Sequence, residues 1–460
     1  MRKTIVSTNR SIVSSNRSVA KCRNVCLLLL VGIGVFLFWW LWHPEALSFQ
    51  EQNQLFLWTG DYLAERLSTS GGLADWLGEF IVQFFYVEWL GALLMALLFV
   101  LMYWLSVKAI FSPPDRVGLG VALLFPLFFL WLMGDENVLV ALPVAFTLVL
   151  AAVALMRRVR KVWWLPIAVA LWWAVGMSWT TYYRIPQHGP DFSGWNGDKW
   201  ELLKQDYLIR HERWDNIIER AKMHEVQTPF WSNSVNLALA MKGQLADKMF
   251  DYWQSGEDAL LMPMVRDNVS NLPTAEAFWR LGMVNEALRY MSDIQESILN
   301  ARKSGRFEQR IVECMLVNGK YRVAYKHIQL LKKSLFYASW AEDAERFLTG
   351  QRSPLIAPLN AKRALRFKQN FLFNYPEIDK MLGILFQENT QNKMALEYFL
   401  GQLLLKGDAQ TFMQALPLAQ QHGDYHVMPM VYQDAVGCMQ SRSIPDTPYG
   451  RYVKRKMGGR

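Results

Sequence analysis

The chain has 460 residues, of which 52% are hydrophobic, and it carries a formal net charge of +9. Its basic residues border long apolar runs, which is typical of membrane topology, so the charge does not favour nucleic-acid binding. Four cysteines are too few for a disulfide framework, and no Cys or His cluster has zinc-ligand spacing. A single disulfide bond between Cys314 and Cys438 is an alternative if the C-terminal half lies in an oxidising compartment.

The first predicted element is a membrane anchor at residues 25–42. Residues 1–24 precede it with several bases and no acid, which is typical of a cytoplasmic tail. An apolar helix of about 18 residues, rising ~1.5 Å per residue, just crosses the ~30 Å hydrocarbon layer. The run ends in bulky aromatic residues and not in the small residues that a signal peptidase requires. We therefore expect a retained anchor.

Residues 44–80 form an intermediate segment, predicted to be an amphipathic loop that lies in the membrane interface. Apolar residues recur there at three- and four-residue intervals, as in an amphipathic helix, and Gly71-Gly72 breaks the pattern. They are Leu47, Phe49, Leu55, Phe56, Tyr62, Leu63 and Leu67, with the acids Glu45, Glu51, Asp61 and Glu65 between them. The loop has many acids and a single base, Arg66, which predicts an external position.

Four further apolar runs predict spans at residues 82–107, 117–134, 138–156 and 162–180. The loops between them alternate in charge: residues 108–116 and 157–161 are basic, and residues 135–137 read Asp-Glu-Asn. If the N-terminus is cytoplasmic, every basic stretch falls inside and every acidic loop outside. This alternation predicts that the chain beyond residue 180 lies across the membrane.

One passage of the membrane half carries a family resemblance. The segment GGLADWLGEFIVQFFYVEWLGALL (71–94) resembles a family of uncharacterised multi-pass membrane proteins from Bacteroidetes-type bacteria. The resemblance implies a bacterial inner-membrane protein with a periplasmic C-terminal half, and it brings no known activity.

After a linker at residues 181–199, rich in Gly and Pro, residues 200–442 read as short helices. Three segments share one plan, in which an apolar helix ends at a glycine (Gly243, Gly282 and Gly319) and a second amphipathic helix follows. Two further segments fit with Glu212 and Gly407 at the turn, and the long interval before Gly407 leaves room for one or two more pairs.

This plan resembles the tetratricopeptide repeat, a helix pair of 34 residues. Ala287 and Ala324 occupy its small-residue position, whereas Lys248 and Phe412 depart from it. The resemblance implies a solenoid of about five to seven pairs with a concave surface for a partner protein or peptide. Residues 443–460 lack an apolar period and are strongly basic, so we expect a disordered tail.

The sequence contains few motifs that are typical of catalytic, cofactor or metal sites. The chain has no phosphate-binding glycine loop, nucleophile elbow, HExxH or dinucleotide fingerprint, so we expect no cofactor and no metal. His422 and His426 have the spacing of two ligands on one helix face, but Gly423 between them favours a helix end.

One enzymatic hypothesis rests on the polar residues of the first external loop. Membrane glycosyltransferases that use lipid-linked sugars carry acids in such a loop, and some continue into a tetratricopeptide-like domain. His43 and Glu45 begin this loop, and Asp61 or Glu65 would act as general base. The simpler interpretation is a solvated polar face on an interfacial helix.

The sequence thus predicts an all-α protein with about five transmembrane helices followed by a soluble tetratricopeptide-like α-solenoid. The predicted function is a non-catalytic inner-membrane scaffold, whose partners are the lipid bilayer and a protein bound by the periplasmic repeats, with no nucleic acid. The alternative is a membrane glycosyltransferase-like enzyme with Asp61 and Glu65 as catalytic candidates. A transporter is disfavoured, because five spans without internal repeats are poor material for alternating access.

Overall fold

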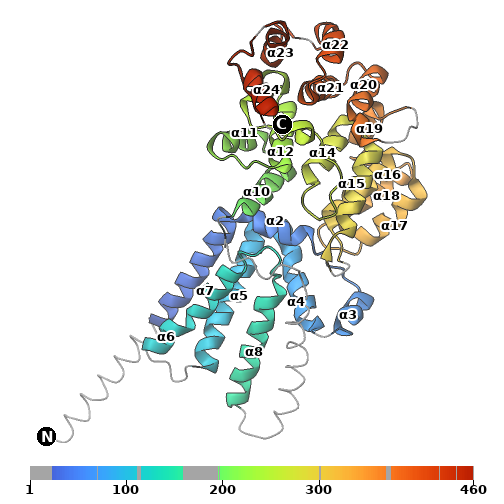
Figure 1. The fold of residues 1–460 in the computed structure, drawn as a ribbon. Coiled ribbons are helices and arrows are strands. Elements are labelled where there is room, and N and C mark those ends of the chain that lie inside the picture. Colours follow the sequence, from blue (N-terminus) through green and yellow to red (C-terminus); the bar gives the residue numbers. More distant parts are fainter. Residues whose placement is uncertain are drawn as a thin grey trace, which may run out of the picture. The chain divides into compact units, whose positions relative to one another are not determined.

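A computed structural model describes residues 23–69, 71–110, 116–158, 195, 197–299, 302–368, 374–423, 425–441 and 443–458. Within these ranges the secondary structure is helical and has no strand, as predicted. The chain divides into an N-terminal unit, Met1–Gly197 with Ser334–Phe336, and a C-terminal unit, Asp198–Lys333 with Tyr337–Arg460 (Figure 1). The predicted basic tail up to residue 22, the fifth span at 162–180 and most of the linker lie outside the described residues.

The N-terminal unit begins with the helix Arg23–Trp42, whose last turn is the π-helical η1 (Phe38–Trp42). It continues with α2 (Pro44–Gln52), α3 (Gly60–Leu67), α4 (Gly72–Val82), η2 (Gln83–Tyr86), α5 (Glu88–Ala109), α6 (Arg116–Ala122), α7 (Leu124–Leu132) and α8 (Ala141–Arg158). Among the described residues, Arg23–Trp42 and Glu88–Ala109 are long and apolar enough to cross a membrane, and Val117–Leu132 and Ala141–Arg157 are shorter apolar helices.

These four apolar stretches expose large hydrophobic side chains. On α5 the exposed residues Leu93, Leu97, Leu101 and Trp104 recur at helical spacing and form one stripe. The first helix exposes Leu29, Leu30, Ile33 and Leu41 in the same way, and α7 exposes Leu124, Leu127 and Phe128. Soluble monomers rarely show so much contiguous apolar surface.

In segment 44–80 the predicted break at Gly71-Gly72 lies between α3 and α4, but the amphipathic helix expected before the break is divided into α2 and α3. The segment contains three helices, and the polar face of α2 is buried, including Glu45 and Glu51. The reason is tertiary: the Gln50 amide donates to the Val138 carbonyl at 3.0 Å, so α2 covers the loop between α7 and α8. The predicted second span also begins later, at Glu88, because Val87 is extended and separates α5 from η2.

The C-terminal unit contains fifteen described α-helices. They are α10 (Asp198–Arg210), α11 (Trp214–Met223), α12 (Pro229–Met241), α13 (Leu245–Lys248), α14 (Leu272–Leu281), α15 (Val284–Glu296), α16 (Gly305–Val317), α17 (Tyr321–Leu331), α18 (Ala338–Leu348), α19 (Ile356–Leu365), α20 (Ile378–Glu388), α21 (Lys393–Lys406), α22 (Ala409–His422), α23 (Met430–Gln440) and α24 (Pro448–Gly458). Consecutive helices from α14 to α18 pack against each other. As the spacing indicated, α22 ends at His422, with Gly423 as its C-cap.

One turn recurs between the helices of this unit. A residue with positive φ ends the first helix of a pair at Glu212, Gly243, Gly282, Gly319, Gly350 and Gly407. In each case the next N–H returns to a carbonyl five residues earlier, as from Met283 to Phe278 at 2.9 Å, which satisfies a helix-end carbonyl. The five predicted turns are confirmed, and Gly350 supplies one more between α18 and α19.

Two features depart from a linear array of pairs. The second helix after Gly243, α13, has four residues and passes into the 3-10 turn η4 (Met249–Asp251), at the place where Lys248 breaks the repeat pattern. In addition, α21 and α23 pack against α13. The chain therefore folds back, and the C-terminal helices close on helices some 150 residues earlier, whereas repeats in a solenoid contact only their neighbours.

The prediction of a disordered tail is wrong for residues 448–458, which form the helix α24 (Figure 1). Tyr449 and Tyr452 are buried, and both rings pack against Phe250 at about 5 Å between centroids. The Lys456 ammonium donates to the carbonyls of Leu405 and Lys406, at 2.7 and 2.9 Å, where α21 ends. The basic composition concealed this helix in the sequence, because the large side chains that it buries are two tyrosines on one face.

Replacing Lys456 by methionine is expected to lower the unfolding free energy of the C-terminal unit by about 1–2 kcal/mol, since it removes a cation from the carbonyl end of α21. Thermal unfolding of the purified full-length chain measures the change. Lys454→Met is the matched control, because Lys454 lies on the exposed side of the same helix. Equal midpoints for the two variants would contradict the docking of α24.

Candidate functional site

The structure separates the four residues of the enzymatic hypothesis. Asp61 and Glu65 lie on α3 with exposed side chains, and Glu65 forms a long ion pair with Arg66 at 3.8 Å. His43 and Glu45 do come together: His43 Nδ1 is 2.9 Å from Glu45 Oε1, and the Glu45 carboxylate is buried. The His43 ring also contacts the ring of Trp195, with 4.5 Å between centroids.

A different carboxylate of this loop, Glu79 on α4, is fully buried. The Tyr62 hydroxyl and the Arg66 guanidinium, both on α3, donate to Glu79 Oε2, the latter at 2.9 Å. Burial raises the pKa of the Tyr62 hydroxyl, and the Glu79 charge raises it further. Tyr62 and Arg66 are four residues apart and so share a helix face. Sequence analysis missed this triad, which joins α3 to α4.

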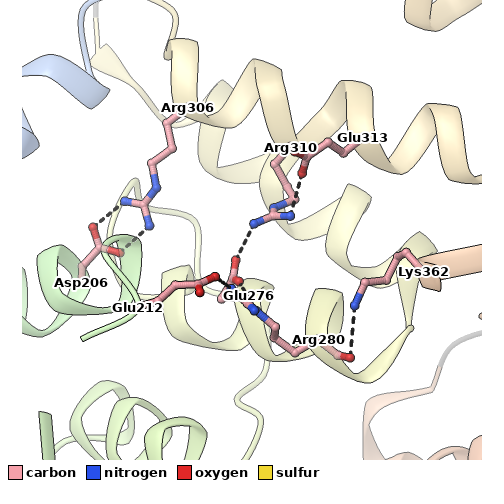
Figure 2. A network of polar contacts seen from close by, with 8 residues as sticks. All are labelled: Asp206, Glu212, Glu276, Arg280, Arg306, Arg310, Glu313 and Lys362. Carbon is pink, nitrogen blue, oxygen red and sulfur yellow. Dashed lines mark hydrogen bonds and ion pairs between the residues drawn. The ribbon is translucent and has the colours of Figure 1, made fainter. Parts of the chain in front are cut away.

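A second polar constellation lies in the C-terminal unit, and we call it the ion-pair network (Figure 2). It draws on α10, the α10–α11 turn, α14, α16 and α19. Its four acids are Asp206, Glu212, Glu276 and Glu313, and its four cations are Arg280, Arg306, Arg310 and Lys362. The formal charges balance, so the network is neutral at pH 7.

Glu276 is the centre of the network. Its two carboxylate oxygens accept from Arg280 Nε at 2.7 Å and from an Arg310 guanidinium nitrogen at 2.9 Å. Burial alone would raise the pKa of Glu276, but Arg310 and Arg280 outweigh it and hold the pKa at about 2. Arg280 also donates to Glu212, and Arg310 to Glu313 at 2.7 Å. The centre therefore joins α14 to α16 and to the α10–α11 turn.

A second bridge ties α16 to α10. Arg306 donates to both oxygens of Asp206, at 2.6 and 2.9 Å, in a bidentate pair. Such a planar pair fixes orientation as well as distance. Because the two residues are a hundred positions apart, the pair holds together two helices that are distant in the sequence.

Lys362 of α19 sits at the edge of the network beside Trp279. The Trp279 ring lies 4.5 Å from the Arg310 guanidinium carbon and 5.0 Å from the Lys362 ammonium, measured to its centroid. Lys362 also donates to the Arg280 carbonyl at 3.3 Å. Burial, and then the neighbouring Arg280 and Arg310, lower the pKa of Lys362 to about 8.

The ion-pair network holds helices together and offers no reactive group. Each acid of the network is bonded to a cation, so none is poised as a general base. The nearby Cys314 thiol is buried, and burial raises its pKa, which makes it a poor nucleophile. Cys314 and Cys438 are both unpaired thiols in this structure. Among the described residues, no group of three or more His, Cys, Asp or Glu side chains could hold a metal ion.

Of the eight network residues, sequence analysis singled out Glu212, as a turn. The spacing of Glu276 and Arg280, four apart, indicates a local helix pair, and so does that of Arg310 and Glu313, three apart. No local pattern identifies the long-range partner of Asp206 or of Lys362.

Comparison with known proteins gives a match over most of the chain. A protein family described as "Family of unknown function (DUF6057)" matches residues 18–185 and 176–456. No curated protein and no solved structure matches the chain.

Proposed function

The chain belongs to this family of unknown function, and from its architecture we propose that it is a membrane-anchored scaffold without catalytic activity, whose C-terminal unit binds a partner protein. The observation that carries the proposal is the contrast between the units. The N-terminal unit exposes apolar helix faces, and the C-terminal unit is a set of helix pairs with buried apolar faces and an internal ion-pair network.

Several features of the N-terminal unit support a bilayer as its surroundings. Exposed apolar stripes run along three of the four apolar stretches, namely the first helix, α5 and α7. The exposed Trp40, Trp42, Trp89 and Trp104 lie toward helix ends, where tryptophan favours the interface. We propose that these four stretches and the predicted span at 162–180 make up the five membrane passes. Helices that are short for the bilayer are accommodated by local thinning.

The charges at the helix ends support the proposed orientation. Gln50 joins the acidic segment after the first helix to the acidic loop at residues 135–137, so the two lie at one end of the bundle. Arg23 lies near Tyr103, toward the end of α5 that carries Lys108. Basic ends favour the cytoplasm. The proposed location is therefore a bacterial inner membrane, with the C-terminal unit in the periplasm.

The recurring left-handed turn supports a tetratricopeptide-like origin for the C-terminal unit. Ala287 and Ala324, in the small-residue position, are fully buried, as close helix packing requires. Because the C-terminal helices fold back, the proposed partner surface is a local one on the helix pairs and not one long concave groove.

The orientation is tested by reporter fusions at the C-terminus. We expect an alkaline phosphatase fusion to be active and a green fluorescent protein fusion, exported the same way, to be dark. The same reporters placed after Arg158, at the end of α8, serve as controls and should give the reverse pattern, because that end is proposed to be cytoplasmic. An inactive phosphatase fusion together with a fluorescent green fluorescent protein fusion, both at the C-terminus, would overturn the proposal.

The scaffold role is tested by photo-crosslinking in cells. A crosslinking residue at the exposed position of Tyr325 on α17 should capture one defined protein, and one at the buried position of Ile328 on the same helix should not. Equal labelling at both positions, or labelling by lipid alone, would count against a protein partner.

A further inference from the structure

Helix α19 (Ile356–Leu365) is attached to the C-terminal unit by few apolar contacts. Of its ten residues, Leu359 is buried, with 3% of its surface exposed, and Ile356 at its start is exposed to 40%. By contrast, eight of the thirteen residues of the neighbouring α16 are buried. Apolar burial is the main source of helix stability in a protein, so α19 opens at a lower free energy than α16.

The contacts that hold α19 are mostly polar and come from two adjacent cations. Arg363 donates to the carbonyls of Leu316 and Val317, at 2.7 and 3.3 Å, where α16 ends. Lys362 donates to the Arg280 carbonyl, as Figure 2 shows. Its ammonium also faces the Trp279 ring. The carbonyl end of α16, which is the negative end of its helix dipole, therefore receives the positive side chain of Arg363.

The surface beneath α19 is shaped for a helix end. Gly282, at the α14–α15 turn, has φ of 93°, and a Cβ atom there would lie 2.6 Å from the Leu365 carbonyl oxygen. The last turn of α19 thus rests directly on the Gly282 backbone. At Gly319, the equivalent turn residue with φ of 70°, a Cβ atom would meet nothing within 4 Å.

The charge of α19 differs from that of its neighbours. Residues 349–368 contain no acid and carry five bases, Arg352, Lys362, Arg363, Arg366 and Lys368. Burial, and then the neighbouring Arg280 and Arg310, lower the pKa of Lys362 to about 8, so the charged form of Lys362 is disfavoured in this position. The carbonyl end of α16 and the Trp279 ring attract cations, so a second basic helix is complementary to the same surface.

We propose that α19 is a displaceable latch on a docking surface, and that the partner segment of the scaffold is a short basic helix that takes its place. The surface consists of the Trp279 ring, Gly282 and the carbonyl end of α16. The partner helix would carry a leucine followed three and four residues later by cations, as Leu359, Lys362 and Arg363 do in α19. The latch itself stands on the contacts above, and the role of the partner rests on the proposed scaffold function.

The test uses the full-length chain in detergent with two opening variants. Gly282→Ala pushes the Leu365 backbone off the surface, and Gly319→Ala is its control, because it places alanine at a similar positive φ without a clash. A Lys362→Glu, Arg363→Glu double variant removes the cations of α19 and leaves Gly282 and Trp279 intact. Hydrogen exchange should accelerate within 356–365 in both opening variants and stay as in the wild type there in Gly319→Ala.

The docking surface is then probed with a fluorescent peptide of residues 353–368. The peptide should bind the Lys362→Glu, Arg363→Glu double variant at least about tenfold more tightly than it binds the wild type or Gly319→Ala, because the surface is free in a larger fraction of molecules. Binding to Gly282→Ala should show no such gain, because the added Cβ atom meets the Leu365 carbonyl of the peptide as it meets that of α19. A peptide with glutamate at positions 362 and 363 should not bind. Fast exchange of α19 in the double variant without peptide binding would overturn the docking surface, and exchange as slow as that of α16 in the wild type would overturn the latch.

These readouts are independent of the scaffold role, because they need no partner from the cell. Failure of the photo-crosslinking experiment with successful peptide binding would reject the partner and retain the latch.

Discussion

Replacing Glu276 by glutamine is expected to lower the unfolding free energy of the C-terminal unit by about 3–5 kcal/mol, because breaking a buried ion pair leaves uncompensated charge. Arg280 and Arg310 both bond to this carboxylate, and both would keep their charge at any pH that the protein experiences. Urea unfolding of the full-length chain, followed at pH 7, measures the difference.

The loss should depend on pH in a defined direction. The pKa of Glu276 is about 2 in the folded chain, below the ordinary value of 4.5. Folding therefore favours its charged form, so its stabilisation is complete above pH 4.5 and fades as the pH falls toward 2. The difference between the wild type and Glu276→Gln should shrink over this window.

Glu313→Gln is the matched control for this variant. Glu313 also bonds to Arg310, at 2.7 Å, but burial raises its pKa, so folding disfavours the charge of Glu313, whereas it favours that of Glu276. Replacement of Glu313 by the uncharged glutamine should therefore cost clearly less than Glu276→Gln. Equal losses for the two variants would mean that packing, and not the charge of Glu276, holds α14 to α16.

Replacing Glu79 by alanine is the second change with a large expected effect, about 3–5 kcal/mol on the N-terminal unit. The carboxylate is fully buried and accepts from Tyr62 and Arg66, so its removal leaves a cation and a hydroxyl without their acceptor. Thermal unfolding of the detergent-solubilised full-length chain should show a lower midpoint for the transition of this unit.

Glu65→Ala serves as control, because Glu65 is exposed and its contact with Arg66 at 3.8 Å is weak. Its effect should stay within about 0.5 kcal/mol. If Glu79→Ala left the midpoint unchanged and abolished the function of the protein in cells, Glu79 would be a reactive group and the scaffold proposal would fail.

The sequence by itself determined the features that depend on neighbouring residues. A helix followed by a glycine and a second amphipathic helix predicts a turn with positive φ, and Gly243, Gly282 and Gly319 have it. The small residues Ala287 and Ala324 identify buried positions in the same way. These predictions succeed because helix periodicity and glycine conformation are local properties of the chain.

The tertiary structure alone decided which distant residues meet. The acids Glu45 and Glu51 look solvated in the sequence, but α2 covers the α7–α8 loop and buries them. The basic tail looks disordered, but α21 offers a carbonyl end that accepts Lys456. The position of a charged residue in the sequence does not identify its ion-pair partner, because the partner is determined by distance in space and not by spacing along the chain. For the same reason the ion-pair network, with Asp206 and Arg306 a hundred residues apart, becomes visible once the helices are packed.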